Sequence, residues 1–482
     1  HDIYDSIVDM FDKQALKYSG NDALIEDNRR VTYKELLEKS NQFANYLLNN
    51  LGVTKGDAIC VLTSPSESFI VTILGILKAG AYYVPIDHNY PNERVQYILN
   101  DCQTRLLVSD IKTKEDTANL NIEILNPNDS QIFQSEKITP KQPLGLSDIV
   151  YCIYTSGSTG NPKGCIINNG NLLNYIQWAN EFYFKDENEG DWGLITSVSF
   201  DLTVTSIFTS LTRGRKLWIG DSNKDSGQLI QECFNNKEID TLKLTPSHLT
   251  LLKEIKIGST AIRTVICGGE QLTKSQVRTL KSINEDIRIF NEYGPTETTV
   301  GCIVTEVHEK NEQILIGKPI ANTKIYIVDA ENRECLIGSP GELVIEGQGV
   351  SVGYYNRPEL TSSKFENNFL NTGNIVYRTG DIARWLPNGE IEYLGRKDNQ
   401  VKIRGHRIEL EDIENKLLSF HSIRQSVVIV EEDDEQNKQL TAFIVSDEDL
   451  KISELRPFLL TRIPEYMIPS DFVQIDKIPL TV

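Results

Sequence analysis

The segment AICVLTSPSESFIVTILGILKAGAYYVPI, residues 58–86, decides the fold class. Residues 58–63 form a short apolar run typical of a buried strand, residues 67–78 have the apolar spacing of a helix, and residues 82–86 form a second apolar run. The alternation continues on both sides, with predicted helices at residues 33–50 and 93–101 and a predicted strand at residues 105–109. This order predicts a mostly parallel sheet covered by helices on both faces.

Further along the chain the pattern changes twice. Residues 198–211, 241–244 and 264–267 are predicted to begin further strands or helices of the same kind. Short β runs at residues 324–328, 341–346 and 390–394, separated by Gly, Pro and Asn, predict a small β-rich subdomain over about residues 317–396. Helices at residues 409–418 and 453–461, with a hairpin of residues 426–430 and 440–445 across an acidic turn at 431–435, predict a last compact unit.

These patterns predict an α/β protein of two lobes. Residues 1–396 form a large N-terminal lobe of layered α/β subdomains that includes the β-rich subdomain. Residues 397–482 form a small, mobile α+β C-terminal lobe. With 482 residues the chain can bury a sizeable core, and its length suggests about three structural units.

Composition excludes several functions. Asp and Glu number 68 against 49 Lys and Arg, a formal net charge of −19, and so acidic a surface repels nucleic acid and anionic lipid. The longest apolar stretch, residues 69–77, is too short to span a bilayer. We expect no nucleic-acid or membrane partner. The eight cysteines form no C-x-x-C pair, which predicts buried free thiols in the reducing cytoplasm.

A loop of small residues, TSGSTGNPKG at residues 155–164, follows an apolar strand at residues 149–153. Its glycines allow backbone N–H groups to turn toward an anion, its hydroxyls add donors, and Lys163 adds positive charge. It is not a Walker A loop, because Pro162 precedes the lysine and Gly164 follows it. Taken alone, the loop fits either a phosphate site or a flexible surface segment.

Three further motifs follow in order: NEYGPTETT at residues 291–299, YRTGD at 377–381 and GRKDNQVKIRG at 395–405. Together with the loop they resemble the adenylate-forming superfamily, and most closely the amino-acid-activating adenylation domain of nonribosomal peptide synthetases. The likeness covers nearly the whole chain. It implies attack of a carboxylate on the α-phosphorus of ATP, release of pyrophosphate, and transfer of the acyl group to the phosphopantetheine thiol of a carrier domain.

The resemblance also implies ATP and Mg²⁺ as cofactors and assigns roles to residues. The implied catalytic residues are Lys163, Thr296, Glu297 and Lys402, with Glu297 as the Mg²⁺ ligand. The implied nucleotide-binding residues are Thr155, Ser156, Gly157, Ser158, Thr159, Gly160, Gly269, Tyr293, Asp381, Tyr393 and Arg396. Tyr293 is expected against adenine and Asp381 on the ribose hydroxyls.

Two implications concern the small lobe. Asp398 matches the hinge about which this lobe swings between an adenylating and a thioester-forming pose, and Lys402 and Gly405 would then meet the phosphopantetheine arm. The family places a further catalytic lysine in P-L-T-x-N-G-K. Residues 479–482 read PLTV, so we expect that lysine just past Val482, with the chain truncated before it.

By resemblance, nine residues line the substrate pocket: Asp201, Leu202, Thr205, Lys243, Ile266, Gly268, Glu292, Val300 and Gly301. Asp201 would pair with the α-ammonium group of an amino acid. Lys243 can only donate hydrogen bonds and an ionised Glu292 can only accept them, so the side-chain carboxamide of asparagine answers both. We therefore predict L-asparagine, with aspartate or glutamine as alternatives. The pair could instead form a structural salt bridge.

Two other functions are alternatives, and the first of them shares the ATP motifs. A stand-alone acyl-CoA or aryl-acid ligase predicts no aspartate at position 201 and a more apolar pocket. A non-catalytic nucleotide-binding domain predicts broken ATP motifs, whereas Thr296, Glu297, Asp381 and Arg396 are all present. For the amino-acid-activating enzyme, the expected partners are a carrier domain, a neighbouring condensation domain and an MbtH-like helper protein.

Overall fold

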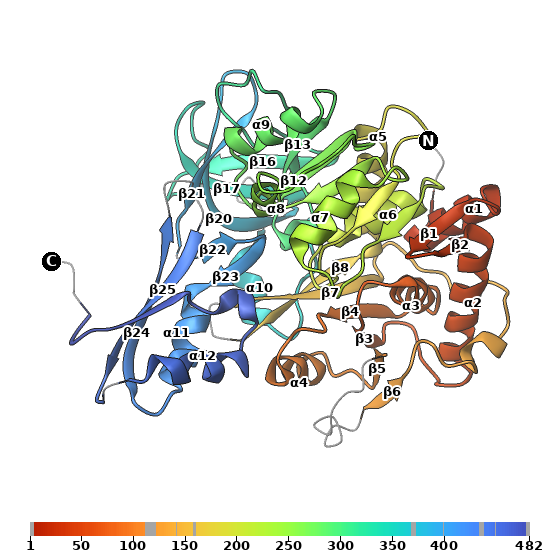
Figure 1. The fold of residues 1–482 in the computed structure, drawn as a ribbon, viewed down its shortest axis with the longest axis horizontal. Coiled ribbons are helices and arrows are strands. Elements are labelled where there is room, and N and C mark those ends of the chain that lie inside the picture. The colour runs from red at the N-terminus through yellow and green to blue at the C-terminus, as the bar shows by residue number, and fades with distance from the viewer. Residues whose placement is uncertain are drawn as a thin grey trace.

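The computed structural model describes residues 4–110, 122–140, 142–157, 161–367, 373–398, 400–432, 438–448 and 450–478. The predicted α/β class is confirmed, with two large, mainly parallel sheets (Figure 1). Nine helices accompany these sheets in the described part of the chain: α1 (Ile7–Lys17), α2 (Tyr33–Asn49), α3 (Glu67–Lys78), α4 (Asn92–Asp101), α5 (Asn169–Phe182), α6 (Leu202–Leu211), α7 (Ser226–Asn235), α8 (Pro246–Leu251) and α9 (Lys274–Ile283).

The first large sheet has nine strands. Their order is β15 (Lys318–Pro319), β14 (Ile303–Val307), β13 (Arg288–Tyr293), β12 (Thr264–Gly268), β11 (Thr241–Leu244), β9 (Trp192–Leu194), β10 (Leu217–Ile219), β1 (Asp22–Glu26) and β2 (Arg29–Thr32). All neighbours from β13 to β1 pair in parallel, and the strands at both edges are antiparallel. The ambiguous run at residues 198–211 forms helix α6.

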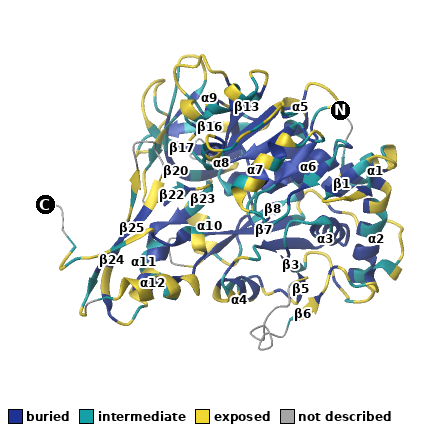
Figure 2. Ribbon diagram, in the orientation of Figure 1, coloured by how far each residue is buried: buried dark blue, intermediate teal, exposed yellow. Residues whose placement is uncertain are grey.

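The second large sheet has seven strands and contains the two strands of residues 58–86. Its order is β18 (Gly353–Tyr354), β8 (Lys163–Asn168), β7 (Ile149–Thr155), β4 (Tyr82–Ile86), β3 (Ala58–Leu62), β5 (Leu106–Ser109) and β6 (Glu123–Leu125). Helix α3 is buried along its length from Phe69 to Lys78, as Figure 2 shows. The buried Lys78 ammonium is paired with Asp12 at 2.7 Å and donates to Asn41 Oδ1 at 2.7 Å.

The predicted β runs after residue 317 form a five-stranded sheet. It contains β16 (Thr323–Val328), β17 (Gly341–Gly347), β20 (Ile375–Trp385), β19 (Phe365–Asn367) and β21 (Ile391–Arg396), with helix α10 (Pro358–Lys364) beside it. One face of this sheet packs in a cluster that includes Tyr293 and Ile303 of the nine-stranded sheet. The subdomain is therefore held directly against the end of β13.

The C-terminal segments gather at one side of the molecule (Figure 1). They comprise β22 (Gln400–Ile403), β23 (His406–Glu409), α11 (Leu410–Leu418), β24 (Ile423–Glu432), β25 (Lys438–Ser446), α12 (Ile452–Leu460) and β26 (Asp471–Gln474). Their buried apolar residues form one cluster of their own, from Ile403 to Ile468. The hairpin β24–β25 is present, and residues 433–435 of its acidic turn lie outside the described residues. The lobe boundary at residue 396 stays a prediction.

All eight cysteines are free, and seven of them are buried, as predicted. Among the described residues, no helix combines the length and the apolar character needed to cross a bilayer.

Helices α2 and α3 are in close contact at Gly75, and this contact can be tested. A Cβ at position 75 would lie 2.8 Å from the Cβ and Cδ1 atoms of Phe43. We expect Gly75→Ala to destabilise the protein by about 1–3 kcal/mol, because overpacking outweighs the better helix propensity of alanine. The midpoint of urea unfolding measures the change.

Gly227→Ala in α7 is the matched control, because a Cβ there would meet only the Asp225 carboxylate at 3.2 Å. We expect this variant to unfold at or above the wild-type midpoint. Equal midpoints for the two variants would contradict the packing argument.

Candidate functional site

The predicted phosphate loop joins two antiparallel strands. β7 ends at Thr155, which pairs with Lys163 at the start of β8. The Ser156 hydroxyl donates to the carbonyl oxygen of Arg407 at 2.6 Å, so the loop contacts the small lobe directly. A Cβ on Gly157 would lie 2.3 Å from a backbone carbonyl oxygen of the same loop, so only glycine fits there. Three predicted residues of the loop lie outside the described residues: Ser158, Thr159 and Gly160.

Glu297, the predicted metal ligand, is a fully buried carboxylate in a short 3-10 turn after β13. Arg407 Nη1 lies 2.9 Å from its Oε1 and 2.7 Å from its Oε2, and the Tyr354 hydroxyl donates to Oε1 at 2.6 Å. Lys163 Nζ lies 3.8 Å from Oε1. Burial alone would raise the pKa of Glu297, but the charges of Arg407 and Lys163 outweigh burial and lower it. Burial lowers the pKa of Lys163 to about 8, and Arg407 adds to that shift.

The predicted nucleotide residues converge beside the five-stranded sheet. Asp381 is buried, and its two oxygens accept hydrogen bonds from the Tyr293 hydroxyl and, at 3.0 Å, from Arg396 Nη1. The rings of Tyr293 and Tyr393 lie 6.3 Å apart. Arg396 also holds the predicted hinge residue Asp398 through two hydrogen bonds of 2.6 and 2.7 Å. The Arg396 guanidinium group thereby joins Asp381 to Asp398.

The hairpin β22–β23 brings the small lobe to the same place. Lys402 Nζ lies 5.7 Å from the centroid of the Tyr293 ring, and burial lowers the pKa of Lys402. A Cβ at Gly405 would lie 2.4 Å from Thr245 Cγ2, and a Cβ at Gly269 would lie 3.6 Å from Gly405 Cα. The turn of this hairpin therefore packs tightly against the loops that follow β11 and β12.

Four of the nine predicted pocket residues lie on parallel strands, toward the carboxyl ends where ligands of α/β sheets bind. Lys243 on β11 is opposite Ile266 on β12, and Gly268 on β12 is opposite Glu292 on β13. Asp201 immediately precedes helix α6, which carries Leu202 and Thr205. Leu202 and Ile266 are both buried. The register of three neighbouring strands thus places the two charged residues next to each other.

Lys243 and Glu292 form a buried ion pair, each with 2% of its side chain exposed. Lys243 also donates to Thr205 Oγ1 at 2.8 Å and to the Tyr175 hydroxyl at 3.3 Å. Two tyrosine hydroxyls donate to Glu292 Oε1, Tyr175 at 2.8 Å and Tyr183 at 2.6 Å. Burial, reinforced by the Glu292 charge, raises the pKa of both tyrosines well above its ordinary value. The structural salt bridge considered above is therefore present.

The last two pocket residues close the turn between β13 and β14. Val300 and its neighbour Thr299 have φ angles of 69° and 60°, a strained conformation for β-branched residues. A Cβ on Gly301 would lie 2.4 Å from Glu292 Cδ. Position 301 must therefore be glycine if the Glu292 side chain is to keep its place.

Asp201 has a buried oxygen, Oδ2, that has no hydrogen-bond partner among the described residues. Burial raises the pKa of Asp201 to about 6, while the Lys243 charge and a hydrogen bond from Thr296 oppose the shift. A buried acceptor without a partner is costly, so this oxygen is suited to a donor that a ligand supplies.

Four residues of the site were not predicted from the sequence: Tyr175, Tyr183, Tyr354 and Arg407. Tyr175 lies within the apolar face of α5, where an aromatic residue indicates core packing. Tyr354 lies on the two-residue edge strand β18, outside the four motifs that carry the family likeness. Arg407 follows the quoted motif by two residues, and no spacing signal connects it to Glu297.

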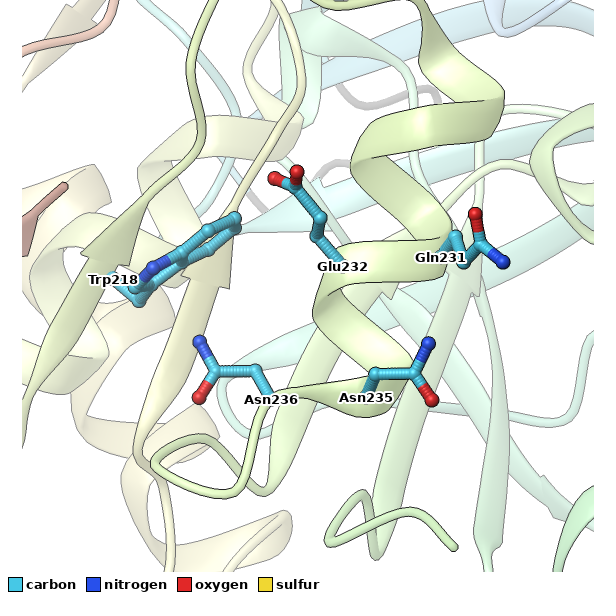
Figure 3. A pocket seen from close by; sticks show the side chains of 5 residues that line it. All are labelled: Trp218, Gln231, Glu232, Asn235 and Asn236. Atoms are coloured by element: carbon cyan, nitrogen blue, oxygen red, sulfur yellow. The ribbon is translucent and has the colours of Figure 1, made fainter. Parts of the chain in front are cut away.

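A surface hollow of about 470 Å³ lies elsewhere and shares no residue with this site. Figure 3 shows Trp218 of β10 facing Glu232 of α7 and Asn236. It is open to solvent, and we assign it no role.

In the described part of the chain, no three His, Cys, Asp or Glu side chains are grouped to hold a metal ion. Glu297 nevertheless fits a magnesium ion that arrives with ATP, because such an ion uses one or two carboxylates and takes its other oxygens from phosphates and water. In the present arrangement Arg407 bonds both oxygens of Glu297.

Comparisons with known proteins agree with this geometry. The family model described as AMP-binding enzyme matches residues 11–355. Tyrocidine synthase 3 of Brevibacillus parabrevis is 41% identical over 480 residues, which cover 99% of this chain and 7% of that protein. Bacitracin synthase 3 of Bacillus licheniformis is 41% identical over 477 residues, 98% of this chain and 7% of that protein. The chain thus spans a small part of the length of these relatives.

Solved structures share the fold. An artificially fused adenylation–PCP di-domain of a nonribosomal peptide synthetase from Klebsiella oxytoca aligns with a TM-score of 0.86 and 24% identity, covering 98% of this chain and 94% of that one. A four-domain nonribosomal peptide synthetase bound to AMP and glycine aligns with a TM-score of 0.74 and 31% identity, covering 100% of this chain and 35% of that one. The chain belongs to the AMP-binding enzyme family and is an adenylate-forming ligase homologous to the adenylation domains of nonribosomal peptide synthetases.

Proposed function

We propose that this ligase activates L-asparagine as asparaginyl-AMP and transfers it to the phosphopantetheine thiol of a carrier domain in nonribosomal peptide synthesis. The observation that carries the proposal is the buried Lys243–Glu292 pair in a pocket that also contains the unpartnered Asp201 oxygen. The Lys243–Glu292 pair would recognise the substrate side chain, and Asp201 would recognise the substrate α-ammonium group.

Asp201 is the proposed partner of the substrate α-ammonium. Its Oδ2 atom is buried and accepts no hydrogen bond from the described residues, so the ammonium group would satisfy it. An aryl or fatty acid has no group that could do so. The unpartnered Asp201 oxygen therefore favours an α-amino acid over the substrates of the stand-alone ligase.

Lys243 and Glu292 are the proposed partners of a side-chain carboxamide. The carboxamide oxygen accepts from Lys243, and its NH₂ group donates to Glu292. Aspartate would place a second carboxylate beside Glu292, which costs free energy in a site shielded from water. Glutamine carries the same carboxamide on a side chain that is one methylene longer, and it is the alternative to asparagine.

For the first half-reaction, we assign each residue a role according to its charge and its place in the site. The substrate carboxylate oxygen bonds the α-phosphorus, the bond from that phosphorus to the bridging oxygen breaks, and pyrophosphate leaves. Lys163 and the loop at residues 155–157 would hold the phosphates, and Thr296, which is hydrogen-bonded to Asp201, would also contact phosphate. Glu297 would hold Mg²⁺, which neutralises phosphate charge when bound. Tyr293, Tyr393, Asp381 and Arg396 would hold the nucleoside.

For the second half-reaction, we propose that the observed arrangement of the lobes is the thioester-forming one. Arg407 bonds the carboxylate that would hold Mg²⁺, and the β22–β23 hairpin with Lys402 packs against the site. The thiol sulfur bonds the acyl carbon, AMP leaves, and the thiol proton passes to solvent. Two solved relatives contain adenylation and PCP domains, which supports a carrier partner. A condensation domain, an MbtH-like helper and a cytoplasmic location belong to the same proposal.

The pH dependence of amino-acid use should report Asp201. Its raised pKa of about 6 means that the carboxylate is ionised at neutral pH and becomes protonated as the pH falls through 6. Only the ionised form pairs with the α-ammonium, so kcat/KM for the amino acid should fall about tenfold per pH unit below 6. Pyrophosphate exchange between pH 5 and 8 measures it.

The Asp201→Asn variant is the control for this profile, and it should be weak and independent of pH in the same range. A wild-type profile that stays flat down to pH 5 would show that Asp201 does not bind the amino group.

The substrate itself is tested by ATP–pyrophosphate exchange with a panel of amino acids, in a protein that contains this chain and continues past Val482. We expect asparagine to give the fastest exchange. In Glu292→Gln, the new amide can donate to a carboxylate, so activity should shift toward aspartate by about 10- to 100-fold relative to asparagine.

An apolar or aromatic amino acid as the best substrate would overturn the asparagine assignment and leave the reaction class intact. No exchange with any amino acid would support the non-catalytic alternative.

A further inference from the structure

The carboxylate of Glu292 has two oxygens with different surroundings. Oε1 accepts hydrogen bonds from the hydroxyls of Tyr175 and Tyr183, which lie in and just after helix α5. Oε2 accepts from Lys243. Both tyrosines are fully buried, so no water competes for these bonds. None of the pocket residues predicted from the sequence lies on helix α5.

The positions of the protons in this network follow from counting donors. Tyr175 has one hydroxyl proton, and it is donated to Glu292. Thr205, whose hydroxyl is 2.7 Å from that of Tyr175, must therefore be the donor between the two. Lys243 directs its three protons to Glu292, to Thr205 and, over a longer distance of 3.3 Å, to Tyr175.

This arrangement leaves one open acceptor position on Glu292. Each carboxylate oxygen has about two lone-pair sites. Two tyrosines fill both sites of Oε1, and Lys243 fills one site of Oε2. Every described hydrogen-bond partner of the two oxygens is a donor, so the remaining site on Oε2 is open to one more donor.

We propose that Tyr175 and Tyr183 are positioning residues that determine the selection of a carboxamide over a carboxylate. They fill both acceptor sites of Oε1 and leave a single acceptor site, on Oε2 next to Lys243. The inference rests on the proposed function, since it concerns how that pocket reads the asparagine side chain. It adds two residues, outside the predicted pocket, to the determinants of specificity.

Both polar groups of a primary carboxamide find a partner in this arrangement. Its NH₂ group fills the open site on Oε2. Its oxygen accepts the Lys243 proton that now makes the weak 3.3 Å contact with Tyr175. A carboxylate has no proton for Oε2, so two anionic oxygens would face each other in a buried site.

Phenylalanine replaces tyrosine without disturbing the ring packing. The Tyr183 ring contacts Phe290 and Trp178 edge to face, at 5.0 and 5.3 Å, and these contacts need no hydroxyl. Tyr183→Phe therefore removes one hydrogen bond to Glu292 and little else. Tyr175→Phe is a second, independent variant that also removes a partner of Thr205.

The experiment measures kcat and KM for asparagine and aspartate by pyrophosphate exchange, in the protein that continues past Val482. We expect Tyr183→Phe to lower the ratio of kcat/KM for asparagine to that for aspartate by about 10- to 100-fold, since hydrogen bonds to charged groups are the strong ones. The loss should lie mainly in the KM for asparagine. Tyr175→Phe should change the ratio in the same direction.

A double-mutant cycle separates positioning from general packing. In a Glu292→Gln background, Tyr183→Phe should leave the ratio unchanged, because the tyrosine acts only through the carboxylate. Tyr33→Phe is the matched control. It removes the hydroxyl of another fully buried tyrosine, which donates to the carbonyl oxygens of Ser210 and Arg215. It should leave the ratio at the wild-type value.

The possible failures are distinguishable. If wild type prefers asparagine while both tyrosine variants keep that preference, this inference is overturned and the proposed function stands. The same holds if Tyr183→Phe acts equally with and without Glu292. If wild type does not prefer asparagine over aspartate, the asparagine assignment is overturned and this inference falls with it.

Discussion

A carboxylate that is removed from water must be paired or hydrogen-bonded, and two buried glutamates impose this constraint at the centre of the molecule. Glu292 lies in the predicted pocket near the carboxyl end of β13, and Glu297 follows five residues later. Their partners come from distant segments: Lys243 and the α5 tyrosines for one, and Arg407 and Tyr354 for the other. Compensating these two charges brings both large sheets and the small lobe to one point.

The two compensations have different consequences for function. The Glu292 network lies within the large lobe, and residues of that lobe fill all but one of its acceptor sites, so it can hold one fixed geometry for a substrate. The Glu297 network crosses to the small lobe through Arg407. A cation that binds Glu297 competes with that arginine for the carboxylate, so the arrangement of the lobes and the occupancy of this carboxylate are coupled. By contrast, the exposed ion pair between Lys416 and Glu93, 3.3 Å apart, adds little to lobe contact.

Much of the fold could be predicted because apolar periodicity reports burial directly. The helix at residues 67–78 has the predicted bounds, since Ser66 caps its first turn and glycine at position 80 follows its end. The run at residues 198–211 stayed ambiguous, because a uniformly buried helix has the same pattern as a buried strand. It became helix α6, which begins only after Asp201.

Some features of the site could be predicted from the sequence, and others depend on tertiary structure. Family motifs placed Lys243 and Glu292 in one pocket, but whether they pair depends on the register of β11, β12 and β13, which no local pattern specifies. Tyr183 is 109 residues from the glutamate it contacts, and a tyrosine at the end of an apolar helix indicates core packing first. Contacts between segments so far apart come from tertiary structure.

We propose that a buried carboxylate and a buried ammonium together select a carboxamide. Calorimetric binding of the non-hydrolysable sulfamoyl analogues of asparaginyl and aspartyl adenylate tests this selection, since binding needs no residue past Val482 to act. We expect the asparaginyl analogue to bind at least about 100-fold more tightly, because only it fills the open site on Glu292. Equal affinities, or tighter binding of the aspartyl analogue, would contradict it.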